Sequence, residues 1–346
     1  MPPFKKLSRF LKSAILGSKR AFFLVTVLSS IAFLSVIVTQ VSDMIFQSAS
    51  IVSSVKDSLS ADSVCDSALE IVKSVLKDDI QKNGYDFYSE DFSNTEELWS
   101  KTYILPVDVI YGTVRAVITD ETAKLNVNSL VDSAGRAEGL AKNSYLIVLQ
   151  KFFKTMNVDE SLAGYILDWI DSDSEGMFER DKPRNWFIPY PEELLKLSEK
   201  IPLRSDNFQK LFSNYFEGRE DATSSPYLTF WPYAGVIKIN VNTAPKEVIA
   251  SVIDTPDSLD IADKIVQERK RAPFKSYSEF VNFLQRLIPV RKERFFNIDP
   301  TFLFDVRSDI FSVKIYCKVN ETQVGIFSVI SRPYAGDMKI LAFRRF

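Results

Sequence analysis

The chain has 346 residues, of which 46% are hydrophobic and 25% are charged, and its formal net charge is -2 at pH 7. At roughly 150 residues per domain this globular composition supports two or three folding units, and it lacks the basic excess typical of bulk nucleic-acid binders. The absence of histidine excludes Ser-His-Asp triads, Cys-His dyads and histidine-ligated zinc. Two cysteines exclude an all-cysteine zinc site and allow one disulfide at most.

The N-terminal segment predicts a membrane anchor. Residues 1–20 contain basic residues but no acidic ones, and no charge lies between Ala21 and Asp43. A run of this length can cross a hydrocarbon core of about 30 Å as a helix, and the basic flank predicts a cytoplasmic N-terminus with the residues beyond about 40 outside the inner membrane. A cleaved signal peptide is the alternative, but the apolar run is long and no small-x-small site ends it.

The same helix is predicted to continue beyond the membrane. No proline or glycine lies between Ser18 and Asn83, and apolar residues continue at helical spacing. These residues are Ile45, Val52, Val55, Leu59, Cys65, Ala68, Leu69, Val72, Val75 and Leu76. We therefore expect one helix of about 55 residues, roughly 80 Å long.

A basic leader, a single apolar helix and a following head together resemble type IV pilins and pseudopilins. The resemblance implies that a prepilin peptidase cuts before the apolar segment, and the matching junction is Ala21-Phe22, with alanine at the usual glycine position. Gly17-Ser18 is a second candidate, but a cut there would leave two cations on the mature N-terminus. We expect partner helices to pack against the apolar stripe of Leu24, Val25, Val27, Leu28, Ile31 and Leu34.

The fifth residue after the preferred cut is Thr26. Most pilins carry a glutamate there, which neutralises the N-terminal amine of the subunit ahead. A carboxylate in apolar surroundings is costly without a cationic partner, so a neutral residue suits a subunit with none ahead of it. Thr26 therefore predicts a position at the tip of a filament.

The body of the chain predicts an α+β head with a helical insertion. An alternating β-branched strand is expected at 111–119, and three more strands at 311–319, 325–330 and 339–343. Helices are expected between them at 144–156, 159–169, 192–200, 208–216, 246–252, 259–271 and 278–287. The C-terminal strands predict an antiparallel meander.

A short motif recurs within the helical part. Leu-Asn-Val-Asn-Ser-Leu at 125–130 returns as Ile-Asn-Val-Asn-Thr-Ala at 239–244, and helical sequence follows each copy. Ser129 and Thr243 stand where a hydroxyl can cap the next helix. The recurrence predicts a duplicated helical unit, and helix-entry turns would explain the residue types without one.

These motifs also carry a resemblance to one family. Asp-Glu-Thr-Ala-Lys-Leu-Asn-Val-Asn-Ser-Leu at 120–130, Leu-Asp-Trp-Ile-Asp-Ser-Asp at 167–173, the motif at 239–244 and Phe-Asp-Val-Arg-Ser at 304–308 follow a pilin-like helix in that order. The chain thus resembles the minor pseudopilin K of type II secretion, the general secretion pathway K family. The resemblance implies a pilin fold with a long N-terminal helix packed on an antiparallel sheet, a large helical insertion, and assembly at the pseudopilus tip with minor pseudopilins I and J.

An acidic loop follows the helix expected at 159–169. Acidic residues at a helix C-terminus are disfavoured by the helix dipole and by mutual repulsion, and a hard cation such as calcium would remove that penalty. A solvated loop fits the sequence as well, and the spacing is not that of an EF-hand; the family resemblance implies calcium in this region. The predicted ligands are Asp171, Asp173, Glu175, Glu179 and Asp181.

Two other functions fit the residues of these segments less well. The carboxylates could serve glycoside hydrolysis only if a sugar-sized cleft held them about 5–10 Å apart, and nothing in the sequence implies such a cleft. Residues 239–274 resemble a helix-hairpin-helix DNA-binding unit, but its hairpin at 254–260 has three carboxylates and no glycine to present backbone N–H groups to phosphate. The basic cluster at 269–271 is as well explained by a solvated helix end.

The two cysteines are placed on elements that meet in a pilin fold. Cys65 lies on the apolar stripe of the long helix and Cys317 on an expected strand. A disulfide is permitted outside the inner membrane if the two Cα atoms lie within about 7 Å. Two buried thiols fit equally well.

The sequence therefore predicts a non-enzymatic, single-pass inner-membrane protein with a periplasmic head. Its expected partners are the I- and J-type minor pseudopilins and the inner-membrane assembly platform, without nucleic acid, and a minor pilin of a type IV pilus is the alternative. The expected segments are a leader (1–21), the N-terminal helix (22–80), the first part of the head (81–128), two helical units (129–238 and 239–300) and the C-terminal strands (301–346).

Overall fold

The structure is a computed structural model. It describes residues 4–82, 84–88, 103–105, 112–137, 144–173, 175–178, 184–191, 193–194, 211, 225–233, 235, 237–288, 303–334 and 336–346, with the backbone alone at 4–18, 20 and 103–105. These residues belong to two compact units, Met1–Ala61 and Asp62–Phe346. Of the predicted helices, 192–200 and 208–216 lie almost entirely outside the described residues.

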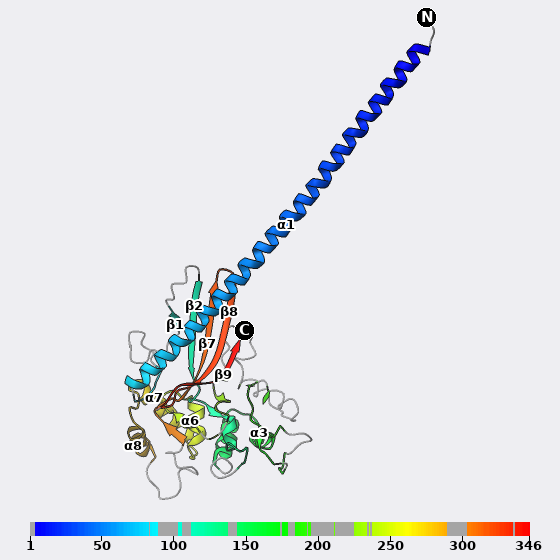
Figure 1. Ribbon diagram of the computed structural model, residues 1–346. Coiled ribbons are helices and arrows are strands. Elements are labelled where there is room, and N and C mark those ends of the chain that lie inside the picture. Colours follow the sequence, from blue (N-terminus) through cyan, green and yellow to red (C-terminus); the bar gives the residue numbers. More distant parts are fainter. Residues whose placement is uncertain are drawn as a thin grey trace. The chain divides into compact units, whose positions relative to one another are not determined.

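The N-terminal helix α1 runs from Phe4 to Lys82 and has 79 residues (Figure 1). Its length follows from the absence of helix breakers over most of its course. The expected length of about 55 residues is too short, because the leader is also helical.

The head contains a five-stranded antiparallel sheet with the strand order β1-β2-β7-β8-β9. Its strands are β1 (Tyr103–Leu105), β2 (Gly112–Asp120), β7 (Ile310–Val319), β8 (Thr322–Ser331) and β9 (Lys339–Arg345). The central strand β7 pairs with β2 from Gly112↔Val319 to Asp120↔Phe311. The predicted C-terminal meander is therefore confirmed, and β2 joins it across the inserted helical block.

The part of α1 within the second unit packs on this sheet. Its buried side chains recur every three or four residues, as a helix facing a sheet requires, and they contact buried residues of β2, β7 and β8. The helix contributes Cys65, Ala68, Leu69, Val72 and Leu76; the sheet contributes Val114, Ala116, Ile118, Phe311, Val313, Ile315, Cys317, Ile326 and Ile330. Burying the larger of these side chains stabilises the head by about 1.5–3 kcal/mol each.

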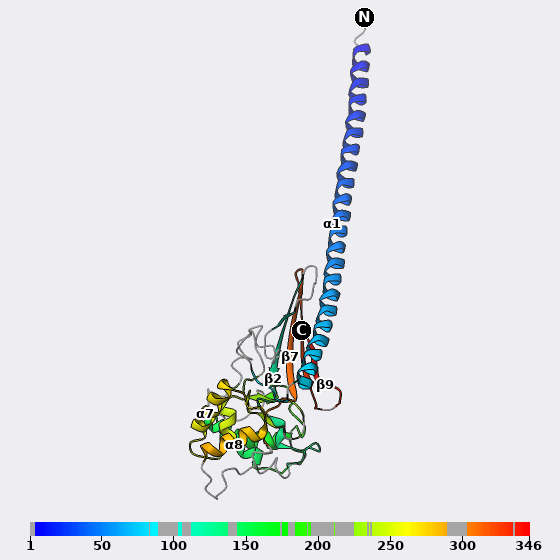
Figure 2. The same ribbon diagram turned by 90° about the vertical axis from the view of Figure 1, so that its left-hand side faces the viewer.

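The inserted block lies at the end of the sheet where β2 ends and β7 begins (Figures 1 and 2). Its described helices are α2 (Leu146–Thr155), α3 (Leu162–Ile170), α6 (Lys246–Val252), α7 (Ser258–Arg271) and α8 (Tyr277–Leu287). They surround a second core that includes Phe152, Ile166, Trp231, Phe280 and Phe304. Helix α2 packs on α6, and Lys151 pairs with Asp254.

The recurring asparagine motif builds the same local structure twice. β3 (Leu125–Asn126) pairs in parallel with β4 (Leu228–Thr229), and β5 (Ile239–Asn240) pairs in parallel with β6 (Phe304–Asp305). The first asparagine of each copy accepts the backbone N–H two residues later, from Asn128 in one and Asn242 in the other. The structure is therefore repeated as well as the sequence.

The second asparagine of each copy holds a distant backbone segment. Asn128 accepts from the N–H of Ile188 and donates to its carbonyl, both at 2.8 Å. Asn242 makes the same pair of bonds with Phe274, both at 2.9 Å. Each asparagine side chain thus both donates to and accepts from the backbone of one distant residue. Because these groups are buried, the two hydrogen bonds fix the position of the segment that carries that residue.

The capping role predicted for the hydroxyl residues is wrong. Ser129 donates to the carbonyl of Gly235, and Thr243 donates to the carboxylate of Asp120. The first asparagine already satisfies the N–H of the residue two positions later, as in an Asx turn, so the hydroxyl is available for contacts between segments.

Candidate functional site

The acidic loop begins at the C-terminus of α3. Asp168 lies in the last turn and is 8% exposed, and Asp171 is the C-cap residue and is 4% exposed. One Asp168 oxygen accepts the N–H of Phe178 at 2.7 Å, and a Cβ added at Gly176 would collide with the same carboxylate. The chain therefore folds back over Asp168, and glycine at 176 makes that approach possible.

The charges in this loop repel one another. Burial raises the pKa of Asp168 above its ordinary value; the nearby Asp173 carboxylate adds to the rise, and the N–H of Phe178 opposes it. Asp173 and Glu175 are exposed, and the Asp173 side chain accepts the N–H of Glu175 at 2.9 Å. A cation held near Asp168 and Asp173 would relieve this repulsion.

The predicted ligand set is only partly described. Glu179 and Asp181 lie outside the described residues. Among the residues that the structure covers, no three carboxylate or cysteine side chains form a group that could hold a metal ion. The oxygen donors at Asp171, Asp173 and Glu175 fit calcium in chemistry, and the calcium site stays a prediction.

Contacts that the sequence did not indicate hold the loop to the block. The N–H of Ser172 donates to the carbonyl of Gly135 at 2.7 Å, and the Asn185 side chain donates to the carbonyl of Asp173. Arg184 pairs with both oxygens of Glu193 at 2.6 Å. These partners are separated in sequence and carry no motif, so the pattern gave no signal for them.

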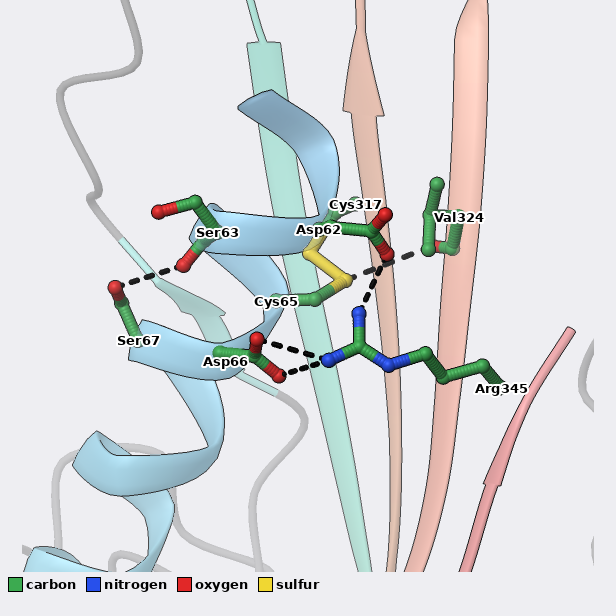
Figure 3. The surroundings of a disulfide bond; sticks show 8 residues. All are labelled: Asp62, Ser63, Cys65, Asp66, Ser67, Cys317, Val324 and Arg345. Atoms are coloured by element: carbon green, nitrogen blue, oxygen red, sulfur yellow. Dashed lines mark hydrogen bonds and ion pairs between the residues drawn. A yellow bond between two sulfur atoms is a disulfide. The ribbon is translucent and has the colours of Figure 1, made fainter. Parts of the chain in front are cut away.

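A disulfide joins α1 to the centre of the sheet (Figure 3). It links Cys65 to Cys317 of β7; their Cα atoms are 5.9 Å apart, and both residues are fully buried. Arg345 of β9 lies beside it and pairs with Asp62 at 2.5 Å and with Asp66 at 2.7 and 2.8 Å. Of the two alternatives for the cysteines, the structure contains the disulfide.

The C-terminal end of α1 is held by a buried arginine. Arg332, which is 1% exposed, donates to Asp79 at 2.6 Å and to Asp86 at 2.5 Å. It also donates to the carbonyl of Ser308 and lies over the ring of Phe311. Burial raises the pKa of Asp79 to about 7 and the nearby Asp86 adds to the rise, against the effect of the guanidinium.

Another buried carboxylate, that of Asp120, lies where the sheet meets the second asparagine motif. Asp120 accepts hydrogen bonds from the hydroxyls of Ser308 and Thr243, both at 2.5 Å, and from the N–H of Thr122. Burial raises its pKa to about 6, and the hydrogen bonds oppose the rise. Asp86 reaches the same cluster, because its carbonyl accepts from Asn240, which also donates to Ser308.

In the segment that resembles a helix-hairpin-helix unit, the guanidinium of Arg269 is bound by the protein's own backbone. Arg269 of α7 donates to the carbonyls of Val241 and Ala244 at 2.6 Å, and burial lowers its pKa to about 10. Asp254, in the hairpin, pairs with Lys151 of α2. Arg269 therefore has a structural role in the asparagine motif, and the hairpin carboxylate joins the two helical units.

The first unit carries the apolar span. Among the described residues, one helix is long and apolar enough to cross a membrane, within Ala21–Lys82, with a mean hydropathy of 2.6 in its most apolar window. The predicted packing residues from Leu24 to Leu34 are exposed along it. The Thr26 hydroxyl donates to the carbonyl of Phe22 at 2.9 Å, so the helix itself satisfies this polar group.

Two comparisons agree with this architecture. A sequence model of the family described as "Type II secretion system (T2SS), protein K" matches residues 239–289, which contain the second asparagine motif with α6, α7 and α8. The crystal structure of the GspK-GspI-GspJ complex from the type 2 secretion system of enterotoxigenic Escherichia coli contains a chain that superimposes with a TM-score of 0.60. The chain has a GspK-like fold.

The structural match covers 84% of this chain and 97% of the other, at 17% sequence identity. No curated protein sequence shows a significant match. The predicted resemblance to pseudopilin K is confirmed by the family match and the GspK-like fold, and so is the predicted α+β architecture with its long N-terminal helix.

Proposed function

We propose that this GspK-like protein is a non-enzymatic minor pseudopilin at the tip of a type II secretion pseudopilus, where it initiates and limits assembly for export across the outer membrane. The observation that carries the proposal is a GspK-like head on the same chain as an exposed apolar helix long enough to span a membrane. A filament subunit needs both parts, because the helix buries itself among neighbours and the head determines what can be added next.

The head is proposed to lie in the periplasm, with the basic leader in the cytoplasm. Positive residues favour the cytoplasmic side of a membrane, and residues 1–20 carry no acidic residue. The Cys65–Cys317 disulfide supports the same topology, because disulfides persist in oxidising compartments outside the cytoplasm. Prepilin peptidase would then cut between Ala21 and Phe22.

The tip position rests on Thr26 and on the size of the head. A neutral fifth residue is stable without the N-terminal amine of a subunit ahead of it. A head enlarged by the helical block would obstruct the addition of further subunits. Thr26→Glu is therefore expected to weaken tip assembly, measured as the number of pseudopili per cell, whereas Thr26→Ser should not. Unchanged pseudopilus numbers with Thr26→Glu would contradict the electrostatic argument.

The partners are proposed to be the I- and J-type minor pseudopilins together with the inner-membrane assembly platform. The matched crystal structure is of a GspK-GspI-GspJ complex. The decisive experiment is affinity purification of the full chain from membranes that contain both minor pseudopilins and the minor pilins of a type IV pilus. We expect a complex with the two pseudopilins, and recovery of type IV pilins instead would overturn the proposal.

Calcium is proposed to bind the acidic loop through Asp171, Asp173 and Glu175, with Glu179 and Asp181 as further ligands. The support is the carboxylate chemistry of the loop and the repulsion between Asp168 and Asp173. Removing calcium with a chelator should lower the melting temperature of the chain by several degrees, and Asp171→Ala with Asp173→Ala should abolish that dependence. A melting temperature that does not respond to calcium would contradict the site.

A further inference from the structure

A loop of the helical block is closed at its base by an ion pair and carries two exposed aromatic rings. The loop runs from Arg184 to Glu193, and the guanidinium of Arg184 donates to both carboxylate oxygens of Glu193 at 2.6 Å. Within this loop Trp186 is 63% exposed and Tyr190 is 45% exposed. Large exposed rings gathered on one short segment indicate an interaction surface.

Hydrogen bonds fix the backbone on both sides of Trp186. The N–H of Asn185 donates to the carbonyl of Trp169 in α3 at 3.1 Å, and Asn128 holds Ile188 through two hydrogen bonds of 2.8 Å. Trp186 lies between these two fixed points, so its backbone is ordered before any partner arrives. An aromatic anchor that is already ordered loses less conformational entropy on binding, which favours affinity.

The surface beside Trp186 is negatively charged. The side chain of Asn185 donates to the carbonyl of Asp173 at 3.3 Å, which brings the acidic loop next to this tryptophan. Asp173 and Glu175 are exposed, and among the residues that the structure describes no cation pairs with either carboxylate. The guanidinium of Arg184 is already neutralised by the ion pair at the base of its loop. The surface therefore carries uncompensated negative charge beside an exposed indole.

A guanidinium combines the properties that this surface recognises. The face of an indole ring attracts a cation within about 6 Å of the ring centroid, and a carboxylate binds a guanidinium through two parallel hydrogen bonds. Arginine supplies both contacts with one flat group, whereas the lysine ammonium is a strongly hydrated point charge. A neutral sugar would stack on the rings but would leave the carboxylates of Asp173 and Glu175 uncompensated.

We propose that this surface binds an arginine-bearing segment of a partner protein, through the rings of Trp186 and Tyr190 and the carboxylates of Asp173 and Glu175. The guanidinium lies on the indole and pairs with one of the carboxylates, and the tyrosine ring covers the segment beside it. This docking surface goes beyond the proposed function and does not depend on it, because every contact that builds it lies within the helical block. The calcium ion proposed above would use the same two carboxylates, so the metal ion and the arginine would compete for them.

Isothermal titration calorimetry tests the docking surface on the full chain in detergent, with the disulfide intact and a calcium chelator present. The probe is a capped peptide of glycine, serine and two arginines. A matched peptide has citrulline in place of each arginine, which keeps the shape and removes the charge. We expect the arginine peptide to bind about tenfold more tightly than the citrulline peptide. Trp186→Ala should remove that preference, whereas Leu259→Ala, at a residue of α7 that is 45% exposed, should leave it unchanged.

The carboxylates are tested with two variants that remove the same amount of charge. Asp173→Asn with Glu175→Gln should weaken binding of the arginine peptide about tenfold. Glu321→Gln with Asp337→Asn neutralises two exposed carboxylates outside the helical block and should leave binding unchanged. All four side chains are exposed, so both variants should keep the melting temperature that the unmodified chain has in the chelator.

Several results would overturn the docking surface. Equal binding of the arginine and citrulline peptides would show that charge is not recognised, and binding that Trp186→Ala leaves unchanged would remove the indole from the site. Equal losses in the two charge variants would reveal bulk electrostatic attraction. Binding of an N-acetylglucosamine oligomer in place of the arginine peptide would identify a glycan surface instead. Each of these results would leave the proposed function standing, because recovery of the pseudopilins from membranes tests that function separately.

Discussion

Arg332 joins the C-terminal end of α1 to the rest of the head through buried ion pairs. It is the cation that lies between Asp79 and Asp86, two buried carboxylates. Removing one partner of a buried ion pair leaves uncompensated charge, which typically costs about 3–5 kcal/mol.

Arg332→Met should therefore lower the free energy of unfolding by about that amount, measured by urea denaturation of the full chain in detergent. The loss of unfolding free energy should be smaller at pH 5 than at pH 8, because Asp79, whose pKa is raised to about 7 by burial, takes up a proton as the pH falls and so loses its charge. Arg307→Met is the matched control, since the pair of Arg307 with Asp309 is partly exposed and surface pairs contribute about 0–1 kcal/mol. Equal losses in both variants would contradict the special role of Arg332.

Asp120 gives the head a defined dependence on pH. Its pKa is raised to about 6 in the folded chain from an ordinary value of 3.8, so the folded state binds the proton more tightly than the unfolded state. The stability that Asp120 contributes is therefore complete below pH 3.8 and is lost as the pH rises through 6.

Between pH 5 and pH 8 this loss should amount to roughly 1 kcal/mol. Asp120→Asn should reduce the pH dependence of the unfolding free energy over this range by that amount. Some dependence should remain, because Asp79, with a pKa of about 7, acts in the same direction. The exposed Asp337→Asn variant is the control, and an identical pH profile for Asp120→Asn and the unmodified chain would count against the assignment.

At the scale of the elements, the disulfide couples α1 to β7 across 252 residues. Cross-linking two points so far apart removes much of the conformational entropy of the unfolded chain. Reduction is therefore expected to lower the unfolding free energy by about 3–5 kcal/mol, seen as a shift of the urea midpoint. The same reductant should have no effect on a Cys65→Ser, Cys317→Ser variant, and a shift there would show that reduction acts elsewhere.

The sequence predicted the elements well where a periodic pattern extends over a whole element. Val72 and Leu76 follow the helical period and Val313, Ile315 and Cys317 the strand period, and the structure buries them against one another. Their partners could be inferred only through the resemblance to pilins, since periodicity shows which face is buried and leaves open what covers it.

Long-range polar contacts escaped prediction. Arg332 and Asp86 are 246 positions apart, and neither belongs to a motif. The sequence predicts the repeat of the asparagine motif, but it also predicts helix capping by the hydroxyls of Ser129 and Thr243, which is wrong. The contact of Thr243 with Asp120 spans 123 positions and depends on the arrangement of the whole block. The acidic loop was located by composition, and its ligand geometry cannot be deduced from spacing.

At the scale of the whole molecule, the five-stranded sheet is built from two parts of the chain that are far apart in sequence: β1 and β2 come before the helical block, and β7, β8 and β9 come after it. The strand β2 and the C-terminal strands enclose the entire helical block in sequence. The core of the block also includes Ile310 of β7, Val329 of β8 and Ala342 of β9, so its packing is complete only when the C-terminal strands are in place. Contacts of high sequence separation form slowly, because loop closure must precede them.

The separation of 252 residues between Cys65 and Cys317 also means that the two cysteines are synthesised at different times. At about 5–20 residues per second, the ribosome needs on the order of ten to fifty seconds to travel from one cysteine codon to the other. During that interval the apolar face of α1 has been synthesised, but the strands β7 and β8 that cover it have not. A nascent chain that stalls before β7 would therefore leave this face of α1 exposed to water, because β2 covers only part of it.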